Sequence, residues 1–496
     1  MEFTLVRHSK PSRNIILPIF EGEELPDYIG SHYSAEDARL IATYLKKVSR
    51  RSVDASDALY LPSGNVAVLL GKGTLDQWNL RRARLLVRRA IVEMKRAGIE
   101  EATLLAESIM GPGSITEELE LVATEAMMAD FSFNEYKTPP KEGWPAVKRL
   151  IIAAEFIPSQ QKELEAAIER GAIIGAETNH TRRLANTPGG DMTPAKLADE
   201  ARRAARLSGA KATILQEPQI RKLGMGGVLG VSRGSDERPR YIIMEYKGRG
   251  YKGKPLVLVG KGVTFDTGGL NMKPGDYMYE MHMDMSGGAA VIHAVAAIAK
   301  LKIGVHVIGL IPAVENMPSG SSYHPGDVLR TMGGKTIEVL NTDAEGRVIM
   351  ADALCYAERY KPRLVVDIAT LTGAAMAALG TRVNALFTDE EAREQLLRDL
   401  GEKSGDYMWP MPLWDEYFDE IRGTFGDVAN AGKSRYGGAI TAALFLKEFT
   451  SYPWAHIDMA PTMTASEGDR LAKGARGTGV RFFVALAQYL AEHAQE

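Results

Sequence analysis

The chain has 496 residues, of which 45% are hydrophobic and 25% are charged. This length exceeds what one ordinary hydrophobic core accommodates, so we expect two domains, and the composition excludes a disordered chain. The 60 basic and 63 acidic residues give a formal net charge of -3, which argues against a dedicated nucleic-acid or membrane-surface binder.

The sequence also predicts the compartment. Its single cysteine, Cys355, excludes an internal disulfide and is typical of a reducing environment. Residues 1–7 lack the charged and then apolar pattern of a signal peptide, and no apolar run reaches membrane-spanning length. We therefore expect a cytoplasmic protein that does not associate with membranes.

Residues 1–158 alternate between strand and helix patterns. The predicted strands cover residues 14–20, 58–61, 66–70, 101–106 and 147–154. Helical patterns fall between them, and such alternation predicts an α/β domain of its own.

One helix of this domain, predicted over residues 78–97, is strongly basic. Its charged side chains are Arg81, Arg82, Arg84, Arg88, Arg89, Lys95 and Arg96. We expect its core side to consist of Leu85, Val87, Ile91 and Met94. A solvated helix face is the favoured interpretation, and contact with DNA is the alternative. Salt-sensitive retention on duplex DNA, lost when these arginines become glutamines, would support DNA contact.

A long helix is predicted over residues 159–185, with Ser159 as its N-cap, and we expect it to connect two domains. Beyond it, apolar strands alternate with helices. These strands cover residues 211–215, 241–246, 256–259, 305–311, 364–368 and 456–458. The pattern predicts a mixed, largely parallel sheet covered by helices on both faces.

Residues 341–347 have the sequence Asn-Thr-Asp-Ala-Glu-Gly-Arg, between a β-rich run and a helix-like segment at residues 348–357. Asp343 and Glu345 would point to the same side of an extended strand end, because side chains repeat there with period two. Both could then bind a hard cation, while Arg347 would pair with an anionic ligand or transition state. A solvated turn with incidental charges is the alternative.

A second apolar strand, at residues 256–259, also runs into a polar, glycine-rich segment, at the position where open α/β sheets bind ligands. Together the two stretches provide one lysine and four carboxylates: Lys261, Asp266, Asp284, Asp343 and Glu345. Four clustered acids would raise one another's pKa, and two divalent ions would resolve the repulsion. Lys261 could form a salt bridge there or, as a neutral amine, ligate a metal.

These stretches are similar to the signature runs of the leucyl aminopeptidase family, including its bacterial aminopeptidase A branch. The run at 341–347 is present without change, and so is Gly-Lys-Gly-x-Thr-Phe-Asp-x-Gly-Gly at 260–269. Further matching runs lie at residues 369–374, 410–413, 437–442, 454–460 and 473–479. The resemblance covers nearly all of the chain from about residue 186 onward.

The resemblance implies three parts of an α/β protein. Residues 1–158 would form an N-terminal, macro-like α/β domain, residues 159–185 a connecting helix, and residues 186–496 the catalytic aminopeptidase domain. That last domain would carry a two-metal site on a mixed, largely parallel sheet sandwiched by helices. A homohexamer, built as a dimer of trimers, is also implied.

The resemblance also implies the roles of the site residues. One ion would be bound by Lys261, Asp266, Asp284 and Glu345, and the other by Asp266, Asp343 and Glu345. The ions would be Mn²⁺ or Zn²⁺, with Mg²⁺ and Co²⁺ as alternatives, because such ligands accept them all. Catalytic roles fall to Lys273, at the developing oxyanion, and to Arg347, which would hold a bicarbonate ion as general base.

Substrate contacts are implied at Lys273, Met281, Asn341, Thr370, Leu371 and Gly373. His282 is not expected to be a ligand, because that position is not one in the family, and His324 and Cys355 are interpreted as structural.

The expected activity follows from these roles. A metal-bridging hydroxide would attack a peptide carbonyl, while the ions accept the free α-amine of the substrate and so restrict cleavage to the first peptide bond. An apolar pocket around Met281 indicates Leu or another apolar residue at the substrate's N-terminus. The alternatives are an enzyme that also acts as a DNA-binding regulator, a two-metal phosphoesterase, and a non-enzymatic assembly component with a vestigial site.

Overall fold

The computed structural model describes residues 1–7, 14–23, 27–48, 55–109 and 114–493. Contacts divide the chain into two compact units, one of Met1–Asn179 with Ser466–Lys473 and the other of His180–Ala465 with Gly474–Glu496. The division falls within the long helix α5 (Gln161–Asn186). The domain limits expected at residues 158 and 185 stay a prediction.

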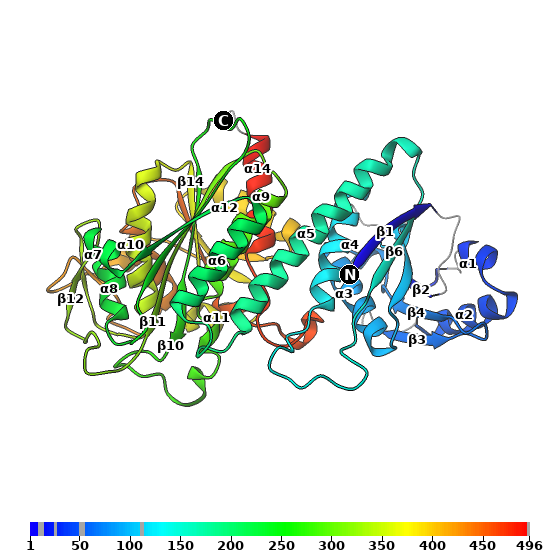
Figure 1. Ribbon diagram of the computed structural model, residues 1–496, viewed down its shortest axis with the longest axis horizontal. Coiled ribbons are helices and arrows are strands. Elements are labelled where there is room, and N and C mark those ends of the chain that lie inside the picture. The colour runs from blue at the N-terminus through cyan, green and yellow to red at the C-terminus, as the bar shows by residue number, and fades with distance from the viewer. Residues whose placement is uncertain (8–13, 24–26, 49–54, 110–113, 494–496) are drawn as a thin grey trace. The chain divides into compact units, whose positions relative to one another are not determined.

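The first unit is an α/β layer structure (Figure 1). Within its described residues, one six-stranded sheet has the order β1-β6-β5-β2-β4-β3, parallel except for the β3–β4 pair. The strands are β1 (Glu2–Arg7), β2 (Ile15–Ile19), β3 (Ser56–Tyr60), β4 (Val66–Gly71), β5 (Glu101–Leu105) and β6 (Arg149–Ala154). Its helices are α1 (Asp27–His32), α2 (Ala35–Val48), α3 (Leu80–Arg96), α4 (Ile115–Asp130) and the start of α5. Five of these strands were predicted, whereas β1 was not.

The solvated face predicted for the basic helix α3 is wrong for part of that helix. Arg84, Arg88 and Arg89 are buried, and Leu85, predicted to face the core, is 37% exposed. Arg84 and Arg88 both bind the fully buried carboxylate of Glu125 on α4, at 3.0 and 2.6 Å. These cations face a protein partner rather than solvent, because a buried charge must be paired.

The second unit contains, in its described part, a mixed nine-stranded sheet. The strand order is β16-β15-β18-β14-β9-β11-β8-β7, and β10 pairs with the far end of β11. The strands are β7 (Lys211–Gln216), β8 (Arg240–Lys247), β9 (Leu256–Gly260), β10 (Gly262–Asp266), β11 (His306–Asn316), β14 (Leu364–Ala369), β15 (Asn384–Thr388), β16 (Met408–Pro410) and β18 (Trp454–Asp458). A separate small sheet is formed by β12 (Val328–Arg330), β13 (Thr336–Glu338) and β17 (Val428–Ala429).

Helices cover both faces of the large sheet (Figure 1). They are α6 (Pro194–Ser208), α7 (Glu217–Lys222), α8 (Gly226–Ser232), α9 (Ser286–Lys300), α10 (Glu345–Ala357), α11 (Gly373–Leu379), α12 (Glu391–Ser404), α13 (Gly438–Lys447) and α14 (Val480–Glu492). Val259 and Leu310 pack on the α10 side, whereas a Cβ built on Gly309 would contact Val291 of α9. This alternation along the strands places α9 and α10 on opposite faces, as predicted for a doubly covered sheet.

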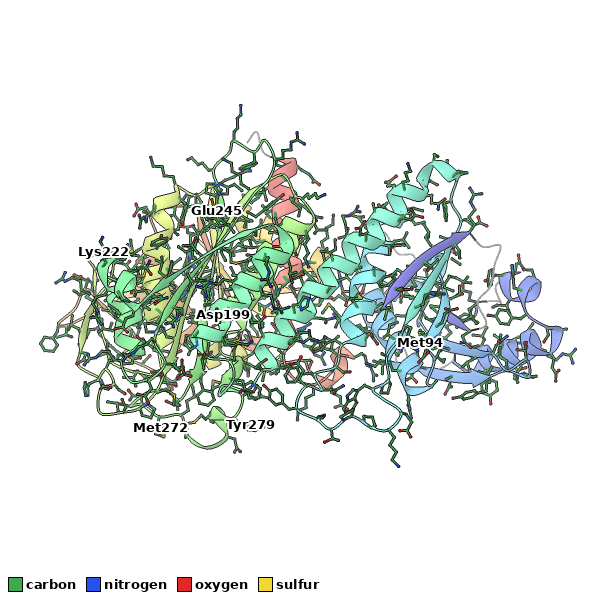
Figure 2. The ribbon with its side chains drawn as sticks, viewed as in Figure 1. Met94, Asp199, Lys222, Glu245, Met272 and Tyr279 are labelled. Carbon is green, nitrogen blue, oxygen red and sulfur yellow. The ribbon has the colours of Figure 1, made fainter. Side chains whose placement is uncertain are left out.

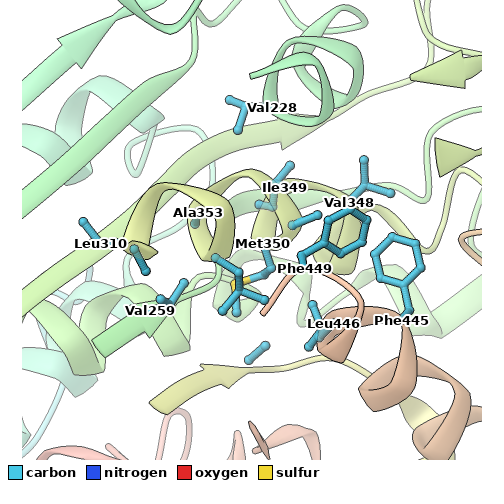
Figure 3. Close-up of a cluster of buried hydrophobic side chains, with 14 of the residues drawn as sticks. Val228, Val259, Leu310, Val348, Ile349, Met350, Ala353, Phe445, Leu446 and Phe449 are labelled. Atoms are coloured by element: carbon cyan, nitrogen blue, oxygen red, sulfur yellow. The ribbon is translucent and has the colours of Figure 1, made fainter. Parts of the chain in front are cut away.

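The helix α10, which follows residues 341–344, is held by a continuous apolar cluster. Figure 3 shows its members from α10, α13, β9, β11, α8 and the segment just after α13, among them Val228, Val259, Leu310, Val348, Ile349, Met350, Ala353, Phe445, Leu446 and Phe449. Fully burying each large side chain contributes about 1.5–3 kcal/mol. The start of α10 is therefore fixed relative to the ends of β9 and β10.

The glycines at the start of α9 permit a close approach of its backbone to the sheet. A Cβ on Gly287 would lie 2.3 Å from the Ile368 carbonyl oxygen, and one on Gly288 would lie 2.7 Å from Cγ2 of Ile311. The helix therefore packs directly against β14 and β11. Among the described residues, none of the helices combines the length and apolarity needed to span a bilayer.

Candidate metal centre

Three carboxylates from two stretches that are distant in sequence converge in the second unit. Asp266 ends β10, Asp343 lies in the turn before α10, and Glu345 begins that helix. One oxygen from each lies within 4.8 Å of the other two. The proximity of Asp343 and Glu345 was predicted, but the reason given was wrong: the strand β13 ends at Glu338, and the turn with the first residue of α10 brings them together.

Two lysines and a fourth carboxylate complete the cluster. The Lys261 amine lies 2.9 Å from Oδ2 of Asp284 and 2.8 Å from Oε1 of Glu345, and it donates to the Thr370 carbonyl oxygen at 3.0 Å. The Lys273 amine lies 2.8 Å from Oδ2 of Asp266 and 2.5 Å from Oδ1 of Asp343. Four carboxylates and two ammonium groups leave two negative charges in excess when all are ionised.

Burial and the excess negative charge shift the pKa values of the side chains in this cluster. Burial, with added repulsion from Asp266, raises the pKa of Glu345 and of Asp284 above the usual range of carboxyls. Burial alone would lower the pKa of Lys261, but the surrounding carboxylates raise it above its ordinary value. The cluster thus favours additional cations.

The donor set fits divalent metal ions. Oε2 of Glu345 is buried and, among the residues that the structure describes, has no hydrogen-bond partner. Oxygen ligands with one amine suit Mn²⁺, Zn²⁺ and Mg²⁺. Lys261 could join them only as a neutral amine, which a nearby divalent charge favours.

Close packing fixes the Lys261 side chain. A Cβ built on Gly346 would lie 2.7 Å from both Cε and Nζ of Lys261. Gly268, with φ of +86°, donates its amide to Oδ1 of Asp266 at 2.8 Å. These two glycines leave room for the lysine and permit the turn after β10.

The predicted substrate residues lie around this cluster to different degrees. Thr370 contacts it directly, since its hydroxyl donates to Oδ1 of Asp284 at 2.7 Å. Asn341 contacts it through Asp343, whose amide donates to Oδ1 of Asn341 at 2.8 Å. Leu371 follows Thr370 directly, and its backbone amide donates to Oδ1 of Asp458 at 3.1 Å. Gly373 is the first residue of α11.

Met281 begins the 3₁₀ turn η5 (Met281–Met283), immediately before Asp284, and is half-buried. The loop between β10 and η5 carries Lys273, and Figure 2 shows its Met272 and Tyr279 side chains at the edge of the unit. These side chains are 57% and 82% exposed. Lys273 therefore reaches inward from a loop whose neighbouring side chains face solvent.

Arg347 lies in the first turn of α10 and is 8% exposed. It makes no hydrogen bond or ion pair with any residue in the described part of the chain, and its Nε is buried. Burial lowers its pKa to about 10, although Glu345 and Asp458 oppose the shift. The guanidinium thus stays charged at neutral pH and could bind a small anion.

Other predicted residues stand outside the cluster. His282 lies on η5. Among the described residues, the group whose ligand atoms come within 4.8 Å of one another consists of Asp266, Asp343 and Glu345 and does not include this histidine. His324 lies 3.6 Å from Asp327 with its side chain 55% exposed. Cys355 packs against Gly333, where a Cβ would lie 2.6 Å from Sγ.

Sequence reasoning missed two buried polar residues that support the site. Asn316 donates to Asp266, and Asp458 accepts the backbone amide of Leu371 at 3.1 Å. Both residues end strands of the large sheet, β11 and β18. A polar residue that ends an apolar strand was the available signal.

The fold and this cluster define a class, the metal-dependent α/β enzymes. Comparison with known sequences narrows the class, because the model of the cytosol aminopeptidase family, catalytic domain, matches residues 179–484. The chain belongs to the cytosol aminopeptidase family and is a metallo-aminopeptidase, a hydrolase. The predicted family and the predicted α/β fold are confirmed.

Individual relatives agree. A probable cytosol aminopeptidase of Syntrophotalea carbinolica is 41% identical over 444 residues, which cover 86% of each chain. One from Geobacter sulfurreducens is 40% identical over 429 residues, covering 86% of this chain and 85% of the relative. The solved structure of the bottromycin maturation enzyme BotP in complex with Mn superposes with a TM-score of 0.82 at 30% identity, covering 97% of this chain and 99% of BotP.

Proposed function

We propose that the protein is a two-metal aminopeptidase that hydrolyses the N-terminal peptide bond of peptides and prefers Leu and other apolar N-terminal residues. The observation that supports this most is the convergence of Asp266, Asp343 and Glu345 within 4.8 Å, beside Lys261 and Lys273. The catalytic domain is proposed to comprise residues 186–496, attached by the helix at 159–185 to the domain at 1–158.

The proposed ligands of one ion are Lys261, Asp266, Asp284 and Glu345, and those of the other are Asp266, Asp343 and Glu345. When bound, such ions supply Lewis acidity and the metal-bridging hydroxide expected for two-metal hydrolases. Mn²⁺ or Zn²⁺ is proposed, with Mg²⁺ and Co²⁺ as alternatives, and the Mn complex of BotP supports the choice.

The chain's own groups would then orient the substrate and stabilise its charge. Lys273, whose side chain is 14% exposed, is proposed to stabilise the oxyanion that develops on the scissile carbonyl. The buried, unpaired Arg347 is proposed to hold bicarbonate, which would take the proton from the attacking nucleophile. Backbone groups of Thr370, Leu371 and Gly373 would position the peptide.

Met281 and Asn341 are the remaining proposed substrate contacts. The half-buried Met281 would form one wall of an apolar pocket for the side chain of the substrate's first residue. Asn341 would contact the substrate next to Asp343, whose backbone amide it binds. We propose that the enzyme is cytoplasmic and forms a homohexamer. A monomeric mass in analytical ultracentrifugation would contradict the hexamer.

The first experiment is hydrolysis of leucine amide and of its N-acetylated form by chelated protein, before and after Mn²⁺ or Zn²⁺ is restored. Metal-dependent cleavage of the free-amine substrate alone is expected. Equal cleavage of the acetylated form would contradict recognition of the α-amine. Phosphate release from a generic phosphoester, without peptide cleavage, would overturn the proposal.

Side-chain preference needs a separate comparison. Dipeptides that differ only in their first residue, Leu against Glu, report the polarity of the pocket. A higher kcat/KM for Leu is expected, and a higher value for Glu would contradict the preference.

A further inference from the structure

Asn316 is a fully buried residue that contacts both halves of the proposed metal centre. It ends β11 beside Asp266, which ends the neighbouring parallel strand β10. Its side-chain Nδ2 donates to Oδ1 of Asp266 at 2.8 Å and to the carbonyl oxygen of Thr342 at 3.0 Å. Thr342 directly precedes Asp343. One amide group therefore links a carboxylate on β10 to the turn that carries the next carboxylate.

The orientation of this amide is determined by its partners. Both neighbouring atoms, a carboxylate oxygen and a carbonyl oxygen, only accept hydrogen bonds, so only the NH₂ end of the side chain suits them. Oδ1 of Asn316 is left buried with no hydrogen-bond partner among the described residues. A buried acceptor without a donor costs stability, so the gain at this position comes from the two N–H donors.

The same contacts make the two oxygens of Asp266 unequal. Oδ1 accepts two hydrogen bonds, from Asn316 and from the Gly268 amide, both at 2.8 Å. These occupy its two lone pairs. Oδ2 instead faces the Lys273 amine at 2.8 Å.

We propose that Asn316 is a positioning residue for the metal centre: it holds Asp266 so that Oδ2 alone is presented to the ions, and it fixes the turn that carries Asp343. This rests on the proposed two-metal function.

The test compares Asn316→Leu, which removes both donors at similar size, with Asn316→Asp, which places a second carboxylate beside Asp266. Asn384→Leu is the matched control, because Asn384 is also buried and bonded, to Tyr407 and Thr462, on the strand β15. Thermal melting of each chelated protein establishes that it is folded. Mn²⁺ is then titrated by calorimetry, and the Mn²⁺-loaded proteins are compared by electron paramagnetic resonance.

Wild type is expected to bind two Mn²⁺ ions. Asn316→Leu is expected to lower the affinity about 10- to 100-fold, the range found when partners of metal ligands are removed, and Asn316→Asp to lower it further. The resonance spectrum of the coupled pair is expected to change in both variants. At saturating Mn²⁺, kcat for leucine amide should fall while KM stays near the wild-type value, since Asn316 is fully buried away from substrate.

Wild-type affinity in both Asn316 variants would overturn the positioning role while leaving the two-metal function intact. An equal loss of affinity in Asn384→Leu would also overturn it, because the effect would then be general destabilisation. A wild-type protein that binds fewer than two Mn²⁺ ions would instead overturn the proposed function, and the role of Asn316 with it.

Discussion

The amine of Lys261 lies 2.8 Å from Oε1 of Glu345, and the two side chains are only 4% and 2% exposed. Dissolved salt screens such a buried ion pair only weakly. Removing one of its two side chains leaves the charge of the other buried and uncompensated. The same lysine contacts Asp284 at 2.9 Å. Changes at this pair should therefore alter both metal binding and the stability of the second unit.

Replacing Glu345 by Ala should abolish hydrolysis. The change removes a proposed ligand of both ions, and kcat/KM for leucine amide should fall about 10³-fold or more, because several kcal/mol of transition-state stabilisation depend on the metals. Glu358→Ala, at an exposed position just after α10, should keep wild-type activity. A Glu345→Ala protein with full activity would contradict the ligand assignment.

Replacing Gly346 by Ala should weaken metal binding with little change in the charge of the site. The new Cβ would meet Lys261 at 2.7 Å, and the amine is held by Asp284, Glu345 and Thr370. Overpacking of this kind costs about 1–3 kcal/mol, which should appear as weaker Mn²⁺ binding in a titration.

The control for this prediction is Gly190→Ala, where an added Cβ has nothing within 4 Å. It should bind Mn²⁺ as wild type does. Unchanged Mn²⁺ affinity in Gly346→Ala would show that Lys261 can shift without loss.

Replacing Arg88 by Gln should destabilise the first unit. Glu125 is fully buried and binds Arg88 at 2.6 Å and Arg84 at 3.0 Å. The substitution removes one of these two cations and should lower the free energy of unfolding by about 1.5–3 kcal/mol, the contribution of a hydrogen bond to a charged group. Urea denaturation measures the change. Arg96→Gln, at the exposed end of α3, should cost at most about 1 kcal/mol.

This prediction also sharpens the test for DNA contact. Glutamine substitutions at Arg84 or Arg88 would disturb the fold as well as the charge, so loss of DNA retention there would be ambiguous. The exposed Arg81 and Arg96 provide the clean comparison. Salt-sensitive retention that both substitutions remove would revive the DNA-binding alternative.

Asp352 should make stability depend on pH. Burial raises its pKa to about 7, although the amides of Met332 and Val228 donate to it at 2.7 and 2.9 Å. The folded state therefore holds a proton that the unfolded chain releases near its ordinary pKa of about 3.9. The stabilising effect is complete below that value and is lost as pH rises through about 7.

Between pH 5 and 7 this group should lower the free energy of unfolding by about 1.4 kcal/mol per pH unit. Asp352→Asn, which cannot ionise, should lack this slope when chelated proteins are denatured with urea at each pH. Asp276→Asn, in an exposed loop, should retain it. Parallel curves for wild type and Asp352→Asn would contradict the prediction.

The apolar strands were predictable because their signal is local. β4 is a continuous apolar run, β14 is apolar apart from Asp367, and every position of both strands is buried. The sequence signal is weaker for β1, whose positions alternate between exposed and partly exposed, and for β16, which has three residues. These two segments become strands because they pair with strands that are distant in the sequence. The strand β10 was not predicted, because it follows β9 after the single residue Lys261 and its sequence, Gly-Val-Thr-Phe-Asp, is typical of a polar, glycine-rich loop.

The cluster of acids and lysines was predictable because contiguous motifs carry it. The residues that hold those groups were not, because their roles depend on contacts across the fold: Asn316 with Thr342, and Asp458 with Leu371. The paired arginines of α3 were misjudged for the same reason. Their partner Glu125 lies on another helix, which periodicity within α3 cannot reveal.

The segment Ser466–Lys473 belongs to the first unit, although residues 180–465 of the second unit precede it in the chain. The Asp469 carbonyl oxygen there accepts a hydrogen bond from the buried Arg88 at 3.1 Å. A ribosome that adds about 5–20 residues per second needs roughly 15 to 60 s to reach this segment after residue 179. During that interval the nascent first unit lacks the segment Ser466–Lys473, and Arg88 lacks the hydrogen-bond acceptor that Asp469 provides. The first unit can therefore be completed only after residues 180–465 of the second unit have been synthesised.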